Sequence, residues 1–315
     1  MSAIYLRDSD LEPLVSYADA IALVEEALKS LAKTDTSNRP RQRVRAGKSG
    51  LNVLVAACGG YVGFKAYSGG PGSPGMLNWL YEAEDGSLVA MLQSNWLSLA
   101  RTSAASAVAT RALAKPDAKV AAFLGAGRQA RGQLQAVCLV RNFADVRCYS
   151  PSGVSAEDLA KLARRLGLNA RACKSAEEAV ASADVVTVAT RGTEIALQGR
   201  WLMPGTHVNA MGVNRGSDRE IDAETVLRAG VIAVDEKENA RTEAGDLIPV
   251  VQGGQMSWDR VHDLGAILNG DAPGRQSAED ITLFESQGLG IEDIAVSAVA
   301  YERAMAKGIG HKLPF

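Results

Sequence analysis

The amino-acid sequence indicates an α/β protein in which a doubly wound, Rossmann-type domain is inserted in an α+β domain. The chain has 315 residues, which is more than one hydrophobic core usually holds. From residue 119 on, short apolar strands alternate with helical segments, as in a parallel sheet with helices on both faces. A long amphipathic helix follows residue 290, and we expect it to return to the first domain. The predicted domains are therefore 1–118 plus 291–315, and 119–290.

The first 118 residues mix an early helix with strands. Apolar residues recur near helical spacing over 18–32, whereas the runs at 51–60 and 61–68 indicate strands. Glycine and proline mark a loop at 68–75. A further strand at 87–93 follows. The region ends in a helix rich in alanine and serine, at 97–114, whose small side chains allow another backbone to approach closely.

The region from residue 119 repeats a strand and then a helix. The predicted strands are 120–124, 146–150, 183–190, 206–212 and 231–235. The predicted helices among them include 157–167, 175–182 and 222–230. Such connections fit right-handed crossovers, so we expect a doubly wound parallel sheet.

A glycine turn follows the first of these strands. It reads Gly125-x-Gly127-x-x-Ala130 and leads into a helix with apolar residues at Ala130, Leu134 and Val137. Gly125 permits a tight turn, Gly127 lets the backbone approach a pyrophosphate, and the small Ala130 lets helix and strand pack. The free N–H groups of the helix N-terminus favour phosphate. Although glycine turns are common, this strand–turn–helix context predicts dinucleotide binding rather than a plain turn.

The predicted cofactor-binding residues lie in this turn and at the ends of two later strands. They are Gly125, Ala126, Gly127, Arg128, Gln129, Ala130, Ser150, Ser152 and Thr190. NAD enzymes usually place a carboxylate after the second strand, on the ribose 2′-hydroxyl. Here Ser150 and Ser152 occupy that place, and Asp145 precedes the strand. Because hydroxyls and backbone N–H groups can bind a 2′-phosphate that a carboxylate would repel, NADP is favoured over NAD.

Composition excludes several classes of partner. A net charge of −2 and an aromatic content of 5% argue against a nucleic-acid-binding protein. Arginines do stand at every second position from Arg39 to Arg45, but this pattern is most often a solvated strand face. The four cysteines are scattered and the three histidines lack ligand spacing, so we predict no disulfide and no metal site. With no signal-peptide pattern and no apolar run near 18 residues, we expect a cytoplasmic protein without membrane contact.

Five longer motifs carry a resemblance to a known family. They are RTSAASAVATRALA at 101, GAGRQARGQ at 125, THVNAMG at 206, EAGDL at 243 and GRQSAEDITLFESQGLGIEDIAV at 274. With them the chain resembles the ornithine cyclodeaminase/mu-crystallin family over nearly its whole length. The resemblance implies a homodimer whose first domain and last helix form the substrate site and the dimer interface. It also implies redox chemistry at the α-carbon of a small amino or imino acid.

The resemblance assigns the family's carboxylate-binding basic residues to Arg41, Lys65 and Arg101. Each also has an ordinary interpretation: one of several exposed arginines, a lysine at a rim, and a charge at a helix end. An arginine fork grips a substrate carboxylate in a bidentate way. Lys65 is the predicted catalytic residue, because a lysine whose pKa is lowered by burial and by arginines could pass a proton to or from an imino nitrogen. The hydride belongs to the cofactor.

Two departures from the cyclodeaminase pattern bear on the substrate. Asn214 stands where the resemblance puts a catalytic aspartate, and Asn52 stands where it puts a glutamate near the distal amine of the substrate. An amide can neither act as a carboxylate base nor neutralise the ammonium group of ornithine. We include Asn52 and Asn214 among the substrate-binding residues. Asp218 and Glu220 lie near Asn214 and are interpreted as a loop charge and a helix-start residue.

Three functions remain open at this point. The leading one is an NAD(P)-dependent oxidoreductase that reduces a cyclic ketimine such as pyrroline-2-carboxylate, or acts as an amino-acid dehydrogenase. The second is ornithine cyclodeamination, which forms proline and ammonia with bound NAD⁺. The third is a non-catalytic, crystallin-like protein that binds a dinucleotide.

Overall fold

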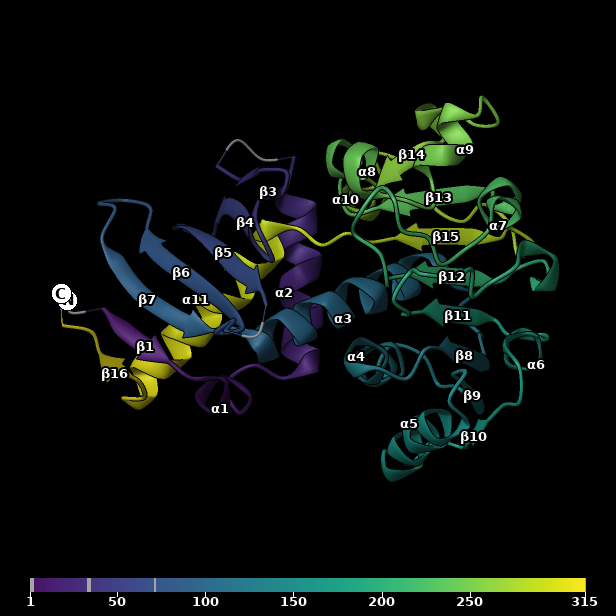
Figure 1. The fold of residues 1–315 in the computed structure, drawn as a ribbon, viewed down its shortest axis with the longest axis horizontal. Coiled ribbons are helices and arrows are strands. Elements are labelled where there is room, and N and C mark those ends of the chain that lie inside the picture. The colour runs from purple at the N-terminus through teal and green to yellow at the C-terminus, as the bar shows by residue number, and fades with distance from the viewer. Residues whose placement is uncertain (1–2, 33–34, 71, 315) are drawn as a thin grey trace. The chain divides into compact units, whose positions relative to one another are not determined.

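The computed structural model describes residues 3–32, 35–70 and 72–314 (Figure 1). The chain divides into two compact units, one formed by Met1–Arg101 with Gly288–Phe315 and the other by Thr102–Gln287. The insertion of a doubly wound unit in an α+β unit is thereby confirmed. The divisions fall after Arg101 and Gln287, rather than after residues 118 and 290.

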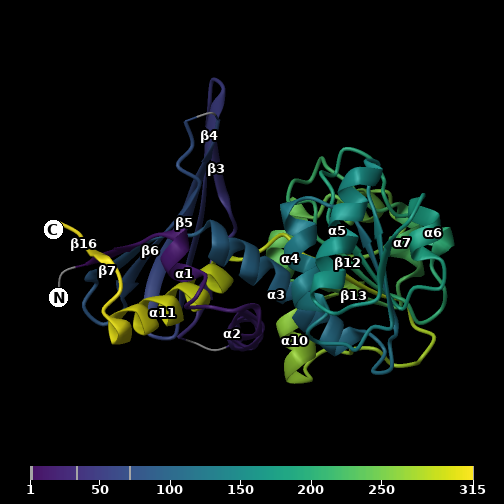
Figure 2. The ribbon, with the colours of Figure 1, turned by 90° about the horizontal axis from the view of Figure 1, so that it is seen from below.

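The first unit is built on an eight-stranded sheet with the order β16-β1-β7-β6-β5-β4-β2, in which β3 pairs with β4. Its strands are β1 (Ile4–Leu6), β2 (Ser37–Asn38), β3 (Gln42–Ala46), β4 (Ser49–Cys58), β5 (Tyr61–Gly69), β6 (Met76–Glu82), β7 (Leu88–Gln93) and β16 (His311–Lys312). All neighbours are antiparallel except β1 and β7. Figure 2 shows β3 and β4 as a hairpin that extends beyond the other strands of this sheet.

Helix α11 (Gly290–Lys307) covers one face of this sheet, and α2 (Tyr17–Ser30) packs against α11. The unit also contains α1 (Asp8–Leu11) and the start of α3 (Asn95–Leu113). The hydroxyl of Ser16 accepts the N–H of Asp19 at 3.1 Å and fixes the start of α2. Helix α11 packs on β4, β5 and β6, as expected for a last helix that returns to this unit. It ends at Gly308, whose φ of 64° suits glycine.

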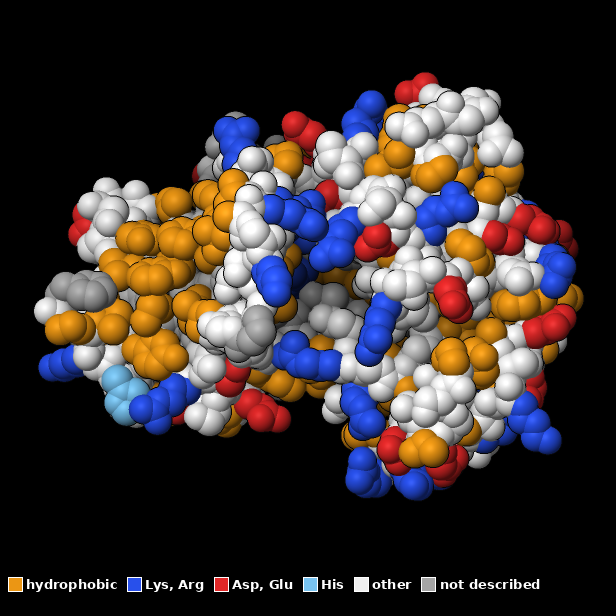
Figure 3. Space-filling model, viewed as in Figure 1, with side chains coloured by type: hydrophobic (Ala, Val, Ile, Leu, Met, Phe, Trp, Pro, Cys, Tyr) orange, Lys and Arg blue, Asp and Glu red, His pale blue; other side chains and the backbone are white. Residues whose placement is uncertain are grey.

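The other face of the sheet is apolar and partly exposed. Val55 and Val62 are 40% and 39% exposed, and the rings of Phe64 and Trp79 stack at 5.8 Å between centroids. In Figure 3 hydrophobic side chains gather over the region where Figure 1 draws β5, β6 and β7. Helix α11 contacts the opposite face of the sheet, through Lys65 and Asn78, so the first unit presents an apolar sheet surface here.

The alternating arginines do not share one solvated strand face. Arg39 and Arg45 are exposed, but Arg41 is only 8% exposed. The backbone N–H of Arg39 donates to the carbonyl of Val55, and β3 begins only at Gln42. The chain before β3 is therefore not a regular extension of that strand, and Arg41 is separated from the exposed arginines.

The second unit has eight parallel strands in the order β10-β9-β8-β11-β12-β15-β13-β14. They are β8 (Val120–Leu124), β9 (Asp145–Tyr149), β10 (Ala170–Ala172), β11 (Val185–Val188), β12 (His207–Ala210), β13 (Val231–Val234), β14 (Val261–Asp263) and β15 (Thr282–Glu285). The central strands are buried on both faces, which explains their continuous apolar runs. The order reverses at β8, between β9 and β11, which is the topological switch point of the sheet.

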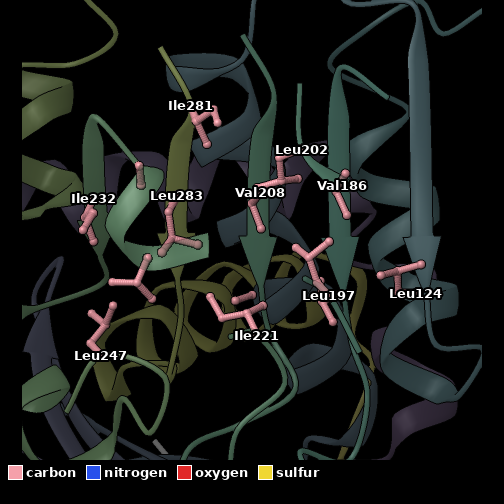
Figure 4. Close-up of a cluster of buried hydrophobic side chains, with 14 of the residues drawn as sticks. Leu124, Val186, Leu197, Leu202, Val208, Ile221, Ile232, Leu247, Ile281 and Leu283 are labelled. Carbon is pink, nitrogen blue, oxygen red and sulfur yellow. The ribbon is translucent and has the colours of Figure 1, made fainter. Parts of the chain in front are cut away.

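Helices and short turns connect these strands. They are α4 (Arg128–Val137), α5 (Gly153–Arg165), α6 (Ala176–Val180), η1 (Gly199–Trp201), α7 (Ala223–Arg228), α8 (Lys237–Glu243), α9 (Ile248–Gln252), η2 (Trp258–Arg260) and α10 (Leu264–Asn269). Figure 4 shows part of the core that they cover, where Leu124, Val186, Val208 and Leu283 come from neighbouring strands. The predicted doubly wound parallel sheet is confirmed.

The second half of α3 belongs to the second unit through buried polar contacts. Thr110 accepts a hydrogen bond from Asn209 of β12 at 2.9 Å, and the carbonyl of Leu113 accepts the hydroxyl of Thr282 of β15 at 3.1 Å. These contacts explain why the division falls inside the helix, after Arg101, and not at the start of β8.

Candidate functional site

The first unit holds a buried cluster of basic and acidic side chains between the sheet and α11. Lys65 lies on β5 and is 2% exposed. Its Nζ donates to Asp293 of α11, at 2.9 Å from Oδ1 and 2.8 Å from Oδ2. A lysine buried to this degree requires such a partner, because desolvation of an unpaired charge is costly. The interpretation of Lys65 as a rim lysine is therefore wrong.

Arg101 binds both acidic residues at the start of α11. Its Nε lies 3.1 Å from Asp293 Oδ1, and its terminal nitrogen lies 2.7 Å from Glu292 Oε2. Asp293 thus joins Arg101 to Lys65, and all three side chains are buried. Arg101 is not merely a charge at a helix end, because its guanidinium is fixed in the interior.

Arg41 and Gly288 complete the cluster. A terminal nitrogen of Arg41 donates to the carbonyl of Gly288 at 3.3 Å. A Cβ at Gly288 would lie 2.3 Å from a terminal nitrogen of Arg101, and the φ of this residue is 78°. Glycine at this position therefore leaves the space in which Arg101 is held. Arg41 is buried rather than exposed, contrary to its ordinary interpretation.

The surroundings of Lys65 lower its pKa. Burial is the largest cause, the positive charge of Arg101 adds to it, and Asp293 opposes both, so that the pKa falls from 10.5 to about 7. Arg41 lowers the pKa further. A lysine with this pKa can both give and accept a proton near neutral pH.

The structure thus brings Arg41, Lys65 and Arg101 together, as the sequence predicts. Glu292 and Asp293 were not predicted from the sequence as members of this cluster. Two acids at the first turn of a helix normally suit the helix dipole and remain in water. The available signal was their place inside an otherwise apolar helix start, within the longest family motif.

The two asparagines lie in different units. Asn52 lies on β4, is half-buried, and its amide donates to the carbonyl of Tyr67 on β5 at 3.4 Å. Tyr67 in turn has its ring centroid 6.0 Å from the Nζ of Lys65. Asn214 lies in the second unit, exposed, on the segment after β12. Their assignment to the substrate stays a prediction.

The glycine turn of the second unit joins β8 to α4. Gly125 has a φ of 104°, and a Cβ there would lie 2.3 Å from the carbonyl oxygen of Ala189. Only glycine fits this position, because it must turn the chain and pass close to the end of β11. Ala130, 1% exposed, keeps α4 close to the sheet.

Gly127 has a different reason to be glycine. A Cβ there would meet nothing within 4 Å, so the packing of the protein does not require glycine. Gly127 is also the N-cap of α4 and provides no side-chain hydrogen bond to the helix. The open backbone at this helix N-terminus suits a phosphate that approaches closely.

The neighbouring residues of the turn fit the same interpretation. Ala126 is half-buried, and Arg128 is exposed at the first position of α4. The buried Oε1 of Gln129 accepts no hydrogen bond from the part of the chain that the structure describes. A polar ligand at this turn would satisfy that oxygen.

The two ends of β9 carry different polar residues. Ser150 follows the strand and is half-buried, whereas the hydroxyl of Ser152 accepts the N–H of Ser155 at 3.4 Å and caps α5. Asp145 is the first residue of β9, at the opposite end of the strand, and pairs with Arg147 at 2.7 Å. No carboxylate of β9 therefore lies at its carboxyl end.

Thr190 follows β11 and is held by a buried acid. Its backbone N–H and its hydroxyl donate to Oε2 of Glu220, at 3.0 Å and 2.9 Å. Glu220 is fully buried, and α7 begins only at Ala223 with Asp222 as its N-cap, so the interpretation of Glu220 as a helix-start residue is wrong. The carboxylate of Glu220 instead accepts hydrogen bonds from Thr190, at the carboxyl end of β11.

The described residues form neither a metal-binding group nor a membrane-spanning helix. No three of their His, Cys, Asp or Glu side chains group in a way that could hold a metal ion. None of their helices is both long and apolar enough to cross a lipid bilayer.

Known proteins resemble this chain along its length. The sequence model of the ornithine cyclodeaminase/mu-crystallin family matches residues 2–308. An alanine dehydrogenase from Archaeoglobus fulgidus is 31% identical over 323 residues, covering 100% of this chain and 99% of the relative. A delta(1)-pyrroline-2-carboxylate reductase from Bacillus cereus is 35% identical over 238 residues, covering 75% of this chain and 73% of the relative.

A solved structure gives the same result. The delta(1)-pyrroline-2-carboxylate reductase of Thermococcus litoralis, in complex with NADH and L-proline, matches with a TM-score of 0.92 and 33% identity. The match covers 98% of this chain and 100% of that one. The chain therefore belongs to the ornithine cyclodeaminase/mu-crystallin family.

Proposed function

We propose that the protein is an NAD(P)-dependent oxidoreductase that reduces a small α-imino acid, such as the cyclic ketimine pyrroline-2-carboxylate. The reverse reaction would make it an amino-acid dehydrogenase. The observation that carries this proposal is the buried cluster of Arg41, Lys65 and Arg101. With Lys65 protonated, these three cations and the carboxylates of Glu292 and Asp293 carry a net charge of +1, which suits the carboxylate of an amino or imino acid.

The cluster would supply binding, orientation and a proton. An arginine held by buried carboxylates keeps a fixed orientation, so that little side-chain entropy is lost when a substrate carboxylate binds. Lys65 would deliver a proton to the imine nitrogen, because its pKa of about 7 places it near the optimum for a general acid at neutral pH. In the reverse direction the neutral amine would remove that proton.

The β8–α4 turn would hold the dinucleotide. Gly125 and Gly127 with the N-terminus of α4 would receive the pyrophosphate. A hydroxyl of the cofactor, rather than a phosphate, could donate to the unsatisfied oxygen of Gln129. When bound, the cofactor supplies the hydride that is added to the imine carbon. The family relative from Thermococcus litoralis is known in complex with NADH, which supports a nicotinamide cofactor in this chain.

The experiment that tests this proposal is a substrate panel. Purified protein is mixed with NADPH or NADH and with pyrroline-2-carboxylate, larger cyclic ketimines, or pyruvate with ammonia, and oxidation of the cofactor is followed by absorbance. We expect oxidation with at least one of these compounds. Absence of oxidation over the whole panel would overturn the proposal and favour a crystallin-like protein that binds the dinucleotide without turnover.

A second assay, with ornithine and NAD⁺, separates reduction from ornithine cyclodeamination. Asn52 and Asn214 stand where that reaction needs carboxylates, so we expect neither proline nor ammonia from ornithine and NAD⁺. Release of ammonia from ornithine, measured directly, would establish the cyclodeaminase instead.

We further propose that NADP is preferred to NAD. The support is the absence of a carboxylate at the carboxyl end of β9, where Ser150 stands. The ratio of kcat/KM for NADPH to that for NADH measures the preference, and Ser150→Asp should shift it towards NADH, since a carboxylate repels the 2′-phosphate. An equal ratio in the wild type and in this variant would contradict the assignment.

We also propose that the protein is a homodimer. The apolar surface of the first unit's sheet, with Val55, Val62, Phe64 and Trp79, is the kind of patch that a second copy would cover.

A further inference from the structure

A buried carboxylate ties together the ends of two neighbouring strands in the second unit. Strands β11 and β12 are adjacent and parallel, with Val188 opposite Ala210, so that Thr190 and Gly212 follow them at the same edge of the sheet. Glu220, on the segment between β12 and α7, binds both. Its Oε2 accepts the N–H and the hydroxyl of Thr190, and its Oε1 accepts the N–H of Gly212 at 2.6 Å.

The space around Glu220 is shaped for this arrangement. A Cβ at Gly212 would lie 2.1 Å from Oε2 of Glu220 and 2.6 Å from the carbonyl oxygen of Thr190, so only glycine leaves room for the carboxylate. The backbone at Glu220 is itself held by the side chain of Asp246. Asp246 Oδ1 accepts the N–H of Glu220 at 2.9 Å and that of Ile221 at 3.1 Å.

The EAGDL motif explains how Asp246 reaches this position. A Cβ at Gly245 would lie 2.0 Å from the carbonyl oxygen of Asp218 and 2.7 Å from that of Arg215. Glycine therefore allows the chain before α9 to pack against the loop that precedes Glu220. Asp246 then binds the backbone of Glu220, and the Glu220 carboxylate binds the ends of β11 and β12.

These strand ends lie on one side of the switch point. In a doubly wound dinucleotide site the pyrophosphate lies at the glycine turn, and the residue after the second strand, here β9, reads the adenosine ribose. The nicotinamide half of a bound dinucleotide would extend in the opposite direction along the same edge of the sheet, over β11 and then β12. The backbone that Glu220 holds is thus the part of the unit that would receive the nicotinamide half.

We propose that Glu220 is a positioning residue that holds the ends of β11 and β12 in the arrangement that receives the nicotinamide half of the dinucleotide. This inference rests on the proposed dinucleotide binding and assigns a role to a residue that does not itself contact the ligand. An ionised carboxylate can accept all three hydrogen bonds from Thr190 and Gly212. A glutamine or a protonated glutamate cannot accept all three, because its NH2 or O–H group is a donor and would face the donors of Thr190 or Gly212.

The charge state of Glu220 makes this role dependent on pH. Burial is the largest cause that raises the pKa of Glu220 from 4.5 to about 7, and Asp246 adds to it, whereas the bonds from Gly212 and Thr190 lower it. The other charged groups packed here are Asp246, Glu285, Asp235 and Arg219. Burial also raises the pKa of Asp246 to about 6, and that of Glu285 well above its ordinary value. Protonation of Glu220 below neutral pH should therefore weaken binding of the nicotinamide half.

The test compares a full cofactor with a fragment in two matched variants. Glu220→Gln replaces one carboxylate oxygen with an NH2 donor, so that the side chain can no longer accept all three hydrogen bonds from Thr190 and Gly212. Asp222→Asn is the control, because Asp222 accepts the N–H of Gly199 at 2.9 Å and the N–H and hydroxyl of Thr225 at 2.9 and 2.7 Å, but serves the start of α7. Calorimetry gives the Kd of NADH and of ADP, which lacks the nicotinamide, and thermal unfolding gives stability.

We expect Glu220→Gln to raise the Kd of NADH by about tenfold or more and that of ADP by about twofold or less, as expected for a lost charge-assisted hydrogen bond. Asp222→Asn should change neither Kd. A folded Glu220→Gln protein with an unchanged Kd for NADH, or with equal losses for NADH and ADP, would overturn the proposal.

A second measurement uses the unmodified protein, in case Glu220→Gln does not fold. The Kd of NADH should fall by about tenfold between about pH 6 and about pH 8, as Glu220 ionises, and Lys65→Met should keep this profile. NADH is used because it lacks the 2′-phosphate, whose own pKa is about 6. A flat profile would overturn the proposal. A protein that binds NADH in this way but reduces no ketimine would contradict the proposed function alone.

Discussion

Lys65 is the side chain on which the proposed proton transfer depends. Lys65→Met keeps the length and the apolar stem but removes the proton, so kcat for imine reduction should fall by about 10² to 10³-fold, the usual contribution of a general acid. Steady-state kinetics with NADPH and pyrroline-2-carboxylate measures this loss. Lys161→Met, at an exposed lysine of α5, is the matched control and should behave as the wild type. A variant at Lys65 with unchanged kcat would remove the residue from the mechanism.

The pKa of Lys65 predicts opposite pH profiles in the two directions. Its ammonium form is present below about pH 7 and is lost above it. As an acid in imine reduction, Lys65 should therefore make kcat/KM fall as the pH rises through about 7. As a base in amino-acid oxidation, it should make kcat/KM rise over the same interval. Profiles of both directions on one preparation check the sign, and a reduction rate that increases with pH would exclude Lys65 as the acid.

The sequence predicted the basic residues of the cluster but not the acidic ones. The family resemblance assigns Arg41, Lys65 and Arg101 to the substrate carboxylate, and Arg101 opens one of its motifs. Glu292 and Asp293 were not recognised, since adjacent acids at a helix start are ordinarily solvated. Their burial depends on partners from distant parts of the chain, since Lys65 lies 228 positions before Asp293 and Arg101 lies 191 positions before Glu292. A local sequence pattern cannot predict contacts between residues so far apart in the chain.

The β8–α4 turn makes a prediction for its two glycines. Gly125→Ala should destabilise the fold by about 1 to 3 kcal/mol from backbone strain alone, in addition to the close contact with Ala189. Gly127→Ala should leave the melting temperature nearly unchanged, because its Cβ would point into open space. It should nevertheless weaken NADPH binding by about tenfold, since a methyl group would obstruct the pyrophosphate.

Thermal unfolding and a binding titration on the same samples separate these two effects. If Gly127→Ala bound NADPH as tightly as the wild type, this turn would not be the site of the pyrophosphate. A Gly125→Ala variant as stable as the wild type would contradict the close contact between the end of β8 and the end of β11.

Regular alternation made most elements of the second unit predictable, and irregular ones were missed. The strands β8, β9, β11, β12 and β13 all follow from short apolar runs. β15 was not predicted, because residues 270–281, which form neither helix nor strand, separate it from α10 and interrupt the strand–helix repeat.

In the first unit, β6 was missed for another reason. It contains Asn78, which is fully buried and bonds to Ser94 and Ser297 from other elements. A polar residue in a strand looks exposed until its partners are known. The hydrogen bonds that stabilise it are long-range and cannot be inferred from the neighbouring sequence.

For the molecule as a whole, the apolar sheet surface of the first unit predicts self-association. The wild type should have twice the 33.1 kDa mass of one chain, measured by light scattering after size exclusion. Val62→Lys places a charge on this surface and should shift the mass towards one chain. Val154→Lys changes an equally apolar residue, 75% exposed on α5, and should not. A monomeric wild type would contradict the dimer.

Under the proposed function, the buried basic cluster makes the substrate carboxylate the main requirement for turnover. The decisive comparison is kcat/KM for pyrroline-2-carboxylate and for 1-pyrroline, the same cyclic imine without the carboxylate, with saturating NADPH. A site built to bond a substrate group rejects an analogue that lacks it by on the order of 10⁴-fold, so we predict reduction of the first and almost none of the second. Equal values for the two imines, or no reduction of either, would contradict a substrate site at Arg41, Lys65 and Arg101.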